Sequence, residues 1–154
     1  AVEAEEAPQY IYSYTHYTSE LYRTELSTGE TTLHTVRNHT FKFGSVWCEV
    51  PGGDIYFTGG TDWEGNYLKK VMRVSGSSFG VTRKSPMLHE RVAHGAVYHS
   101  NYLYVIGGWN DEAMRECERL SVSEDRWEAL NPLPEGITYV SAVVVKKTQC
   151  LYAL

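Results

Sequence analysis

The sequence feature that most constrains the fold is a strand-like run that ends in a Gly-Gly pair and occurs more than once. The clearest copy lies within residues 91–108, where two apolar runs, Ala93–Tyr98 and Tyr102–Ile106, flank a Ser-Asn turn signal. Val, Ile, Tyr and Leu dominate both runs, which favours strands over a helix. Leu103 to Ile106 do not alternate with polar residues, so we expect this strand to be covered on both faces.

The run repeats with a period of 48 residues. Ile55–Gly60 (IYFTGG) matches Leu103–Gly108 (LYVIGG), and one further period leads to Leu151–Leu154. The same spacing joins two other pairs, Phe79 with Trp127 and Pro86 with Pro134. Several positions that share one period indicate a repeat architecture, in which each repeat is one supersecondary unit.

These motifs resemble the kelch repeat, which combines an aliphatic-Tyr strand ending in Gly-Gly, a strand leading to a Trp (CERLSVSEDRW) and a Pro-containing loop (NPLPEG). The resemblance is strongest from about Phe43 to Pro134, although the second repeat has Phe79 for the usual Trp and the first lacks both Gly-Gly and Trp. It implies an all-β chain that folds as a kelch-type β-propeller, with each repeat forming a four-stranded blade. We therefore expect about three such blades plus an incomplete one.

The blades can be given approximate bounds along the chain. After a flexible acidic lead-in at residues 1–8, residues 9–154 divide into blades at about 9–36, 41–84, 91–131 and 138–154, the last one incomplete. This division predicts three strands, then four, four and two. Because propellers typically close with about four to eight blades, the chain is either a partial propeller, completed by a missing remainder, or half of a homodimeric ring.

Charge and composition argue against several classes of partner. Fourteen basic and nineteen acidic residues give a formal net charge of −5, which argues against nucleic acid or membrane as the main partner. No apolar run approaches about 18 residues, so no transmembrane helix is expected. The three cysteines, Cys48, Cys117 and Cys150, form no Cys-x-x-Cys motif. We expect them to be reduced and buried in strands, and the protein to be cytoplasmic.

The resemblance to kelch proteins also implies where a partner binds. In such propellers the loops after Gly-Gly and the loops that cross between blades carry the partner contacts on one face. Transferred to this sequence, the expected contact residues are Asp62, Trp63, Arg91, Trp109, Asn110, Asp111, Thr138 and Tyr139. Trp is enriched in binding hot spots, although each loop Trp could instead fold back over its own blade. For Arg91, pairing with an acidic ligand group and a structural role in the crossing loop both remain open.

The sequence carries no catalytic motif. The six histidines include no His-x-His or His-Glu-x-x-His pattern, and neither Gly-x-Ser-x-Gly nor a phosphate-binding loop occurs. Trp127 and Phe79 hold the packing position of the repeat, whereas acidic residues such as Glu118 and Asp125 are expected on a solvated face. The sequence therefore predicts a non-enzymatic scaffold, without metal or cofactor, that binds a protein or peptide partner.

Two other functions remain open at this point. Some kelch-like propellers bind or modify sugars, and exposed Trp and Tyr in polar loops would suit carbohydrate. Alternatively, the chain could serve as an assembly module that completes a larger propeller.

Overall fold

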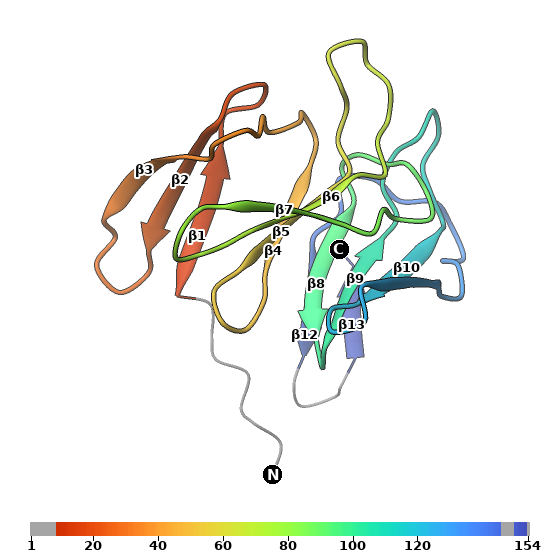
Figure 1. The fold of residues 1–154 in the computed structure, drawn as a ribbon. Coiled ribbons are helices and arrows are strands. Elements are labelled where there is room, and N and C mark those ends of the chain that lie inside the picture. Colours follow the sequence, from red (N-terminus) through yellow and green to blue (C-terminus); the bar gives the residue numbers. More distant parts are fainter. Residues whose placement is uncertain (1–8, 146–149, 154) are drawn as a thin grey trace.

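The structure, a computed structural model, describes residues 9–145 and 150–153 of the 154-residue chain. Within these residues every regular element is a β-strand, and the strands form antiparallel sheets that follow one another along the chain (Figure 1). The sheets contain three, four, four and two strands in chain order, as the sequence predicts. No helix long and apolar enough to cross a membrane occurs in this part of the chain. The predicted all-β fold is confirmed.

Each sheet is a meander, in which strands that follow one another in sequence are hydrogen-bonded neighbours. The first sheet consists of β1 (Tyr10–Tyr14), β2 (Glu20–Glu25) and β3 (Thr31–Thr35). The second consists of β4 (Val46–Glu49), β5 (Ile55–Thr58), β6 (Val71–Val74) and β7 (Val81–Lys84). The third consists of β8 (Gly95–His99), β9 (Tyr102–Ile106), β10 (Cys117–Ser121) and β11 (Arg126–Ala129). The last consists of β12 (Ala142–Val145) and β13 (Cys150–Ala153).

The last three sheets lie side by side, and their first strands touch. β8 contacts both β4 and β12, which makes these three the inner strands of successive blades. Two apolar cores fill the spaces between the first three sheets. Along β5 the side chains alternate between them, with Ile55 and Phe57 in the core shared with the first sheet and Tyr56 in the core shared with the third. A strand of this kind is buried on both faces, as its unbroken apolar sequence predicts.

The Gly-Gly pairs are required because another segment passes against them. Gly59, Gly60, Gly107 and Gly108 all have positive φ angles, between 59° and 109°, where glycine is favoured. A Cβ atom on Gly59 would lie 2.3 Å from the carbonyl oxygen of Arg91. The Gly-Gly pair thus lets the crossing loop approach the end of the blade's second strand. This close approach fixes the positions of the crossing loop and of the loop that follows the Gly-Gly pair.

The structure corrects two alignments between the repeats, that of Phe79 with Trp127 and that of Pro86 with Pro134. Met87 N donates to Lys69 O and Leu133 N donates to Arg115 O, so Pro86 matches Pro132 rather than Pro134. Trp127 lies opposite Leu120 and so takes the place that Val81, opposite Val74, takes in the second blade. Phe79 instead lies in the preceding turn with a φ of 56° and matches Asp125, whose φ is 54°.

The 48-residue period fails here because of loop length. Ten residues, 61–70, separate the Gly-Gly pair from β6, whereas eight, 109–116, separate the next pair from β10. Beyond this loop the repeats are therefore offset by 46 residues. Trp127 is buried as expected, while Phe79 is half-buried and stacks on His34 with ring centroids 3.9 Å apart.

Candidate partner-binding face

The two predicted classes of loop meet on one face of the molecule. The loop after each second strand hydrogen-bonds to the following crossing loop: Tyr17 N donates to Phe41 O, Gly60 N to Arg91 O and Gly108 N to Ile137 O, at 2.6, 3.0 and 2.8 Å. The β1–β2 loop therefore takes the place of a Gly-Gly loop, which makes β1 the second strand of its blade. In Figure 1 the loop between β5 and β6 projects beyond the strand ends at the top of the molecule.

Trp63 is the most prominent side chain of this face. It is 73% exposed and stacks on Tyr17, with ring centroids 4.0 Å apart. The Tyr17 hydroxyl donates to the carbonyl oxygen of Asp62 at 3.2 Å, which ties the β1–β2 loop to the loop that carries Trp63. His16 makes edge contacts with Tyr17 and with Phe43, whose exposed fraction is 54%. We call His16, Tyr17, Phe43 and Trp63 the aromatic cluster.

Sequence reasoning found only one member of the aromatic cluster, Trp63. Tyr17 and His16 were missed because the first repeat has no Gly-Gly pair to mark its loop. Phe43 was missed because it stands at a strand-like position in the sequence. The hydrogen bond of Tyr17 N to Phe41 O shows that the β1–β2 loop matches the Gly-Gly loops.

Trp109 is more constrained than Trp63. Its side chain is 38% exposed, and the indole Nε1 donates to the Tyr67 hydroxyl at 3.1 Å. Its backbone pairs with Val92 in the crossing loop, with the Trp109 N–H donating to Val92 O at 2.8 Å. Trp109 therefore links the loops of the second and third blades while leaving part of its ring open to solvent.

Two of the predicted polar residues shape the loops. The Asp62 carboxylate accepts hydrogen bonds from the backbone of Glu64 and Asn66, both at 2.9 Å, and from the Asn66 amide. The Asn66 side chain, with these backbone groups, holds the pKa of Asp62 below its usual range. Asn110 Nδ2 donates to the carbonyl oxygen of Glu90 at 3.1 Å, which fastens its loop to the crossing loop.

The remaining predicted residues differ in exposure. Tyr139 is 86% exposed, and Asp111 is also exposed; both have positive φ angles, of 55° and 60°. Thr138 is half-buried beside Tyr139. Of the predicted residues, those with exposed side chains are thus Trp63, Trp109, Asp111 and Tyr139.

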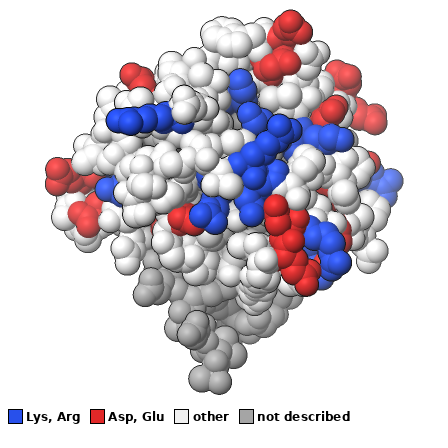
Figure 2. All heavy atoms as spheres, viewed as in Figure 1, with Lys and Arg blue, Asp and Glu red and all other residues white. Residues whose placement is uncertain are grey.

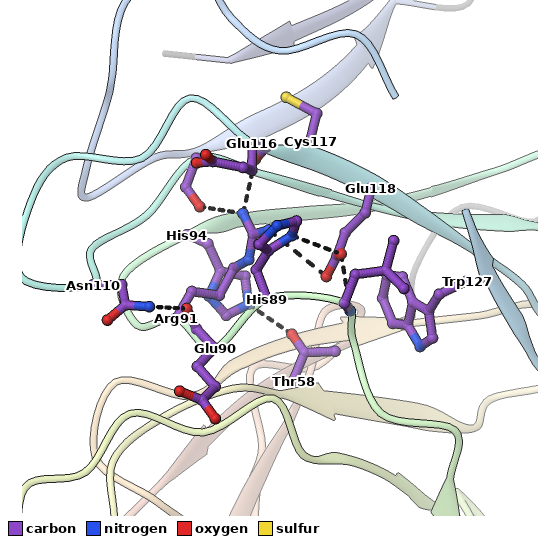
Figure 3. Close-up of polar contacts among 12 residues, drawn as sticks. Thr58, His89, Glu90, Arg91, His94, Asn110, Glu116, Cys117, Glu118 and Trp127 are labelled. Atoms are coloured by element: carbon purple, nitrogen blue, oxygen red, sulfur yellow. Dashed lines mark hydrogen bonds and ion pairs between the residues drawn. The ribbon is translucent and has the colours of Figure 1, made fainter. Parts of the chain in front are cut away.

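Arg91 lies inside the molecule rather than on this face (Figure 3). It is fully buried, and its Nη1 donates to Gly107 O at 2.6 Å and to Glu116 O at 2.8 Å. Its Nη2 lies 3.7 Å from Glu118 Oε1. The guanidinium braces the crossing loop against the third blade, so the structural role replaces the expected partner contact.

Glu118 corrects the expectation of a solvated carboxylate. It is fully buried because β10 is covered on both faces at this level, and its Oε2 accepts the Leu88 N–H at 3.0 Å. Burial raises the pKa of Glu118, and the nearby Arg91 and the Leu88 N–H oppose that rise. Burial also disfavours the charged form of Arg91 and therefore lowers its pKa. Among the described residues, Glu118 Oε1 and Arg91 Nε and Nη2 have no hydrogen-bond partner.

His94 completes this buried polar group. Its Nε2 lies 2.7 Å from Thr58 Oγ1 on the neighbouring blade (Figure 3). Burial, followed by the charge of Arg91, lowers the pKa of His94 to about 3, so the ring is neutral at physiological pH. In the part of the chain that the structure describes, no three His, Cys, Asp or Glu side chains gather as metal ligands. The contact of His94 with Thr58 joins the third blade to the second.

Comparisons with known proteins agree with this architecture. Residues 90–134 match the family model described as the Kelch motif. The chain is 24% identical over 108 residues to kelch repeat and BTB domain-containing protein 2 of Ectromelia virus (strain Moscow), a match covering 70% of this chain and 19% of that protein. It is similar to the solved structure of YjhT, with a TM-score of 0.70, 12% identity, and 84% of this chain and 48% of that chain covered.

The chain thus spans about one fifth of the length of the viral relative and about half of the solved chain. The matched motif contains Arg91, the Gly107-Gly108 pair, Glu118 and Trp127, which build the third blade. Residues 90–134 thus form a kelch motif, and the four-stranded sheets of the chain have the arrangement of propeller blades that its fold shares with the solved structure.

Proposed function

We propose that this chain is a non-enzymatic scaffold that binds a protein or peptide partner through the aromatic cluster and Trp109. The observation that carries the proposal is the stacked Trp63–Tyr17 pair, which leaves an indole 73% exposed on a loop. Burying a ring of this size against a partner gains apolar contact over both its face and its edge. Trp and Tyr are also the side chains that most often dominate binding energy at protein interfaces.

The way these loops are held supports this role. Asp62 closes the loop that carries Trp63, Asn110 fastens the next loop, and the Gly-Gly pairs fix where both loops begin. A surface that is ordered before binding loses less conformational entropy when a partner arrives. The blades thus act as a rigid support for the exposed rings.

The cysteines support a reducing location for this activity. Cys48 and Cys117 are buried thiols that form no disulfide, whereas Cys150, which was expected to be buried, is exposed on β13. Burial raises the pKa of the Cys48 thiol to about 12, which keeps it protonated and unreactive at physiological pH. Thiols persist in the cytoplasm, and we place the protein there.

Selection from a random peptide library, followed by affinity measurement of the enriched peptides, tests the proposal. We expect Trp63→Ala and Trp109→Ala each to weaken binding at least tenfold, because hot-spot aromatic residues contribute most of an interface's affinity. The matched control is Leu33→Ala on the outer strand β3, since Leu33 is 54% exposed but lies outside these loops. Peptides that bind all three variants as tightly as the original chain would contradict the proposal. Selective retention of a glycan that Trp63→Ala abolishes would favour carbohydrate as the ligand.

A second candidate function, assembly of a larger ring, has its own support. Among the described residues, the end strands β1 and β13 are hydrogen-bonded on one side only. A groove of about 620 Å³ lies beside β13, with apolar residues such as Leu130, Leu133, Ile137 and Leu151 in its lining. Open edges and apolar grooves favour further pairing. A solution mass of two chains would support completion by a second copy, whereas a stable monomer at high concentration would contradict self-assembly.

A further inference from the structure

Three basic side chains at the boundary of the first and second blades form no ion pair with any residue that the structure describes. They are Lys42 in the crossing loop, Lys70 just before β6 and Arg83 on β7. Elsewhere on the second blade, Arg73 pairs with Asp54 at 3.2 Å and Lys84 pairs with Asp125 at 3.5 Å. Within the described residues no carboxylate forms a salt bridge with Lys42, Lys70 or Arg83. We call these three residues the cationic cluster.

The fold brings the cationic cluster together from three segments. Gly59 N donates to Lys70 O at 2.9 Å, and a Cβ atom on the adjacent Gly60 would lie 2.7 Å from Lys42 Cβ. Arg83 lies opposite Met72 in the β6–β7 pair, and Met72 is two residues from Lys70, so Lys70 and Arg83 share one face of the sheet. Figure 2 shows Lys and Arg side chains gathered near the centre of this view, over β6 and β7.

The charges of the cationic cluster repel one another. Partial burial lowers the pKa of Lys70, and the charges of Lys42 and Arg83 lower it further. Burial, with Lys70 and Lys42 nearby, lowers the pKa of His39 to about 4, so this neighbour is neutral at physiological pH. Among the described residues no ion pair with a carboxylate offsets this local positive charge. An anionic ligand would relieve the repulsion and lower the free energy of the complex.

The cationic cluster is joined to the aromatic cluster by two segments of the chain. Lys42 precedes Phe43, and Lys70 ends the loop that carries Trp63. A small cleft between the two blades is lined by Lys42 and Lys70 together with the buried rings of Phe41 and Phe57. A segment that places carboxylates over the cationic cluster would therefore reach the exposed rings with its neighbouring side chains.

We infer that Lys42, Lys70 and Arg83 bind the acidic side chains of a partner peptide. This inference rests on the proposed function and names the chemistry of the partner. A peptide is favoured over nucleic acid because the net charge of −5 repels a densely charged polyanion, while the local cluster suits a few carboxylates. The neighbouring exposed rings add a preference for apolar or aromatic residues beside the acidic ones.

Fluorescence anisotropy with a labelled octaglutamate peptide tests the inference on the full chain. We expect binding that weakens as salt is added, because added ions screen exposed charge pairs. Lys42→Gln, Lys70→Gln and Arg83→Gln should each weaken binding about fivefold, as expected for loss of an exposed charge pair. The matched control Arg126→Gln removes the same charge from a residue that already pairs with Glu124 at 3.1 Å. It should change the affinity less than twofold.

Thermal unfolding gives a second readout that does not depend on the ligand. Lys70→Gln should leave the melting temperature unchanged or raise it, because the substitution removes repulsion from Lys42 and Arg83. Unchanged stability with weakened binding would separate loss of a ligand contact from loss of the fold.

Several results would overturn the inference. One is that Arg126→Gln weakens octaglutamate binding as much as the three cluster substitutions do. Another is that octalysine binds with the same affinity as octaglutamate. A third is that a single-stranded DNA oligonucleotide binds more tightly than octaglutamate. The library selection distinguishes this failure from failure of the proposed function. Enriched peptides whose binding needs Trp63 but that carry no acidic residues would support the proposed peptide binding. They would refute the inference that the cationic cluster binds acidic side chains.

Discussion

The two boundaries between the first three blades have the same backbone hydrogen bonds but differ in their side chains, which are apolar at one boundary and charged at the equivalent positions of the other. Phe41 N donates to Thr18 O at 2.9 Å, and Arg91 N donates to Leu68 O at 3.1 Å, so the two residues occupy equivalent positions in their crossing loops. On the facing strands, Met72 lies opposite Phe57, and Glu118 lies opposite Val105. At these positions one boundary thus has apolar side chains and the other a buried Arg–Glu pair, although both boundaries also contain an apolar core.

This difference shows that the blade frame does not dictate how a boundary is held. Apolar packing at Phe41 requires only close contact with neighbouring side chains. A buried charge, in contrast, must have an opposite charge beside it and its hydrogen bonds in place. The Arg91–Glu118 pair meets this need only in part, because three of its polar atoms have no hydrogen-bond partner among the described residues. We therefore expect the ionic boundary to be the more sensitive to single changes.

The largest effect should follow from breaking the ionic boundary at one side. Arg91→Met leaves Glu118 buried without its opposite charge and should lower the free energy of unfolding by about 3–5 kcal/mol. Urea unfolding followed by fluorescence measures the change. Arg115→Met is a suitable control, because Arg115 is exposed, and a loss at Arg91 no larger than at Arg115 would contradict the assigned role.

Acid should weaken both boundaries through their buried histidines. The folded-state pKa values of His94 and His39, about 3 and about 4, lie below the ordinary histidine value of 6.5. The neutral rings therefore favour folding fully above pH 6.5, and this contribution falls as pH decreases toward the folded-state values. Each histidine should remove about 1.4 kcal/mol per pH unit in that window. Urea unfolding between pH 7 and 5 measures the slope, and a flat profile would contradict the burial of both rings.

Transplanting the apolar pair into the ionic boundary should have a smaller net effect. Arg91→Phe combined with Glu118→Met installs the residue types of the first boundary and removes both buried charges. Replacing a buried ion pair by apolar residues is often neutral or stabilising by about 1–4 kcal/mol. We expect the double variant to recover at least the loss caused by Arg91→Met. A double variant less stable than that single variant would show that the two boundaries are not interchangeable.

The two loop tryptophans should have the smallest effects on stability. Trp63→Ala should change the free energy of unfolding by less than about 0.5 kcal/mol because the side chain is mostly exposed. Trp109→Ala should cost about 1–2 kcal/mol because it removes a half-buried ring and its hydrogen bond to Tyr67. Urea unfolding of both variants checks the order. The reverse order would mean that Trp63 is held by its blade rather than presented to a partner.

Much of the fold follows from periodic signals in the sequence. The Gly-Gly pairs, the apolar runs before them and the spacing between copies predict the strands, their order and the loops that meet on one face. The offset at Phe79 was not predictable in this way, because a loop longer by two residues changes the spacing without leaving a motif.

The candidate site was less accessible from the sequence. Trp63 was identified because it follows a Gly-Gly pair, but Tyr17 and Phe43 join it only through contacts between blades. The burial of Glu118 and the convergence of the cationic cluster likewise depend on which strands face each other. Charged residues in a sequence do not show whether they lie in solvent or between sheets.

Hydrogen–deuterium exchange of the chain with and without a selected peptide tests directly whether a partner binds at the loops of this face. We expect slowed exchange in the β1–β2 loop, in residues 61–70 and in residues 109–114, which carry Tyr17, Trp63, Lys70 and Trp109. The outer strands β3 and β11 should exchange at the same rate in both states. Protection confined to β3 and β11, with none in these loops, would contradict partner binding on this face.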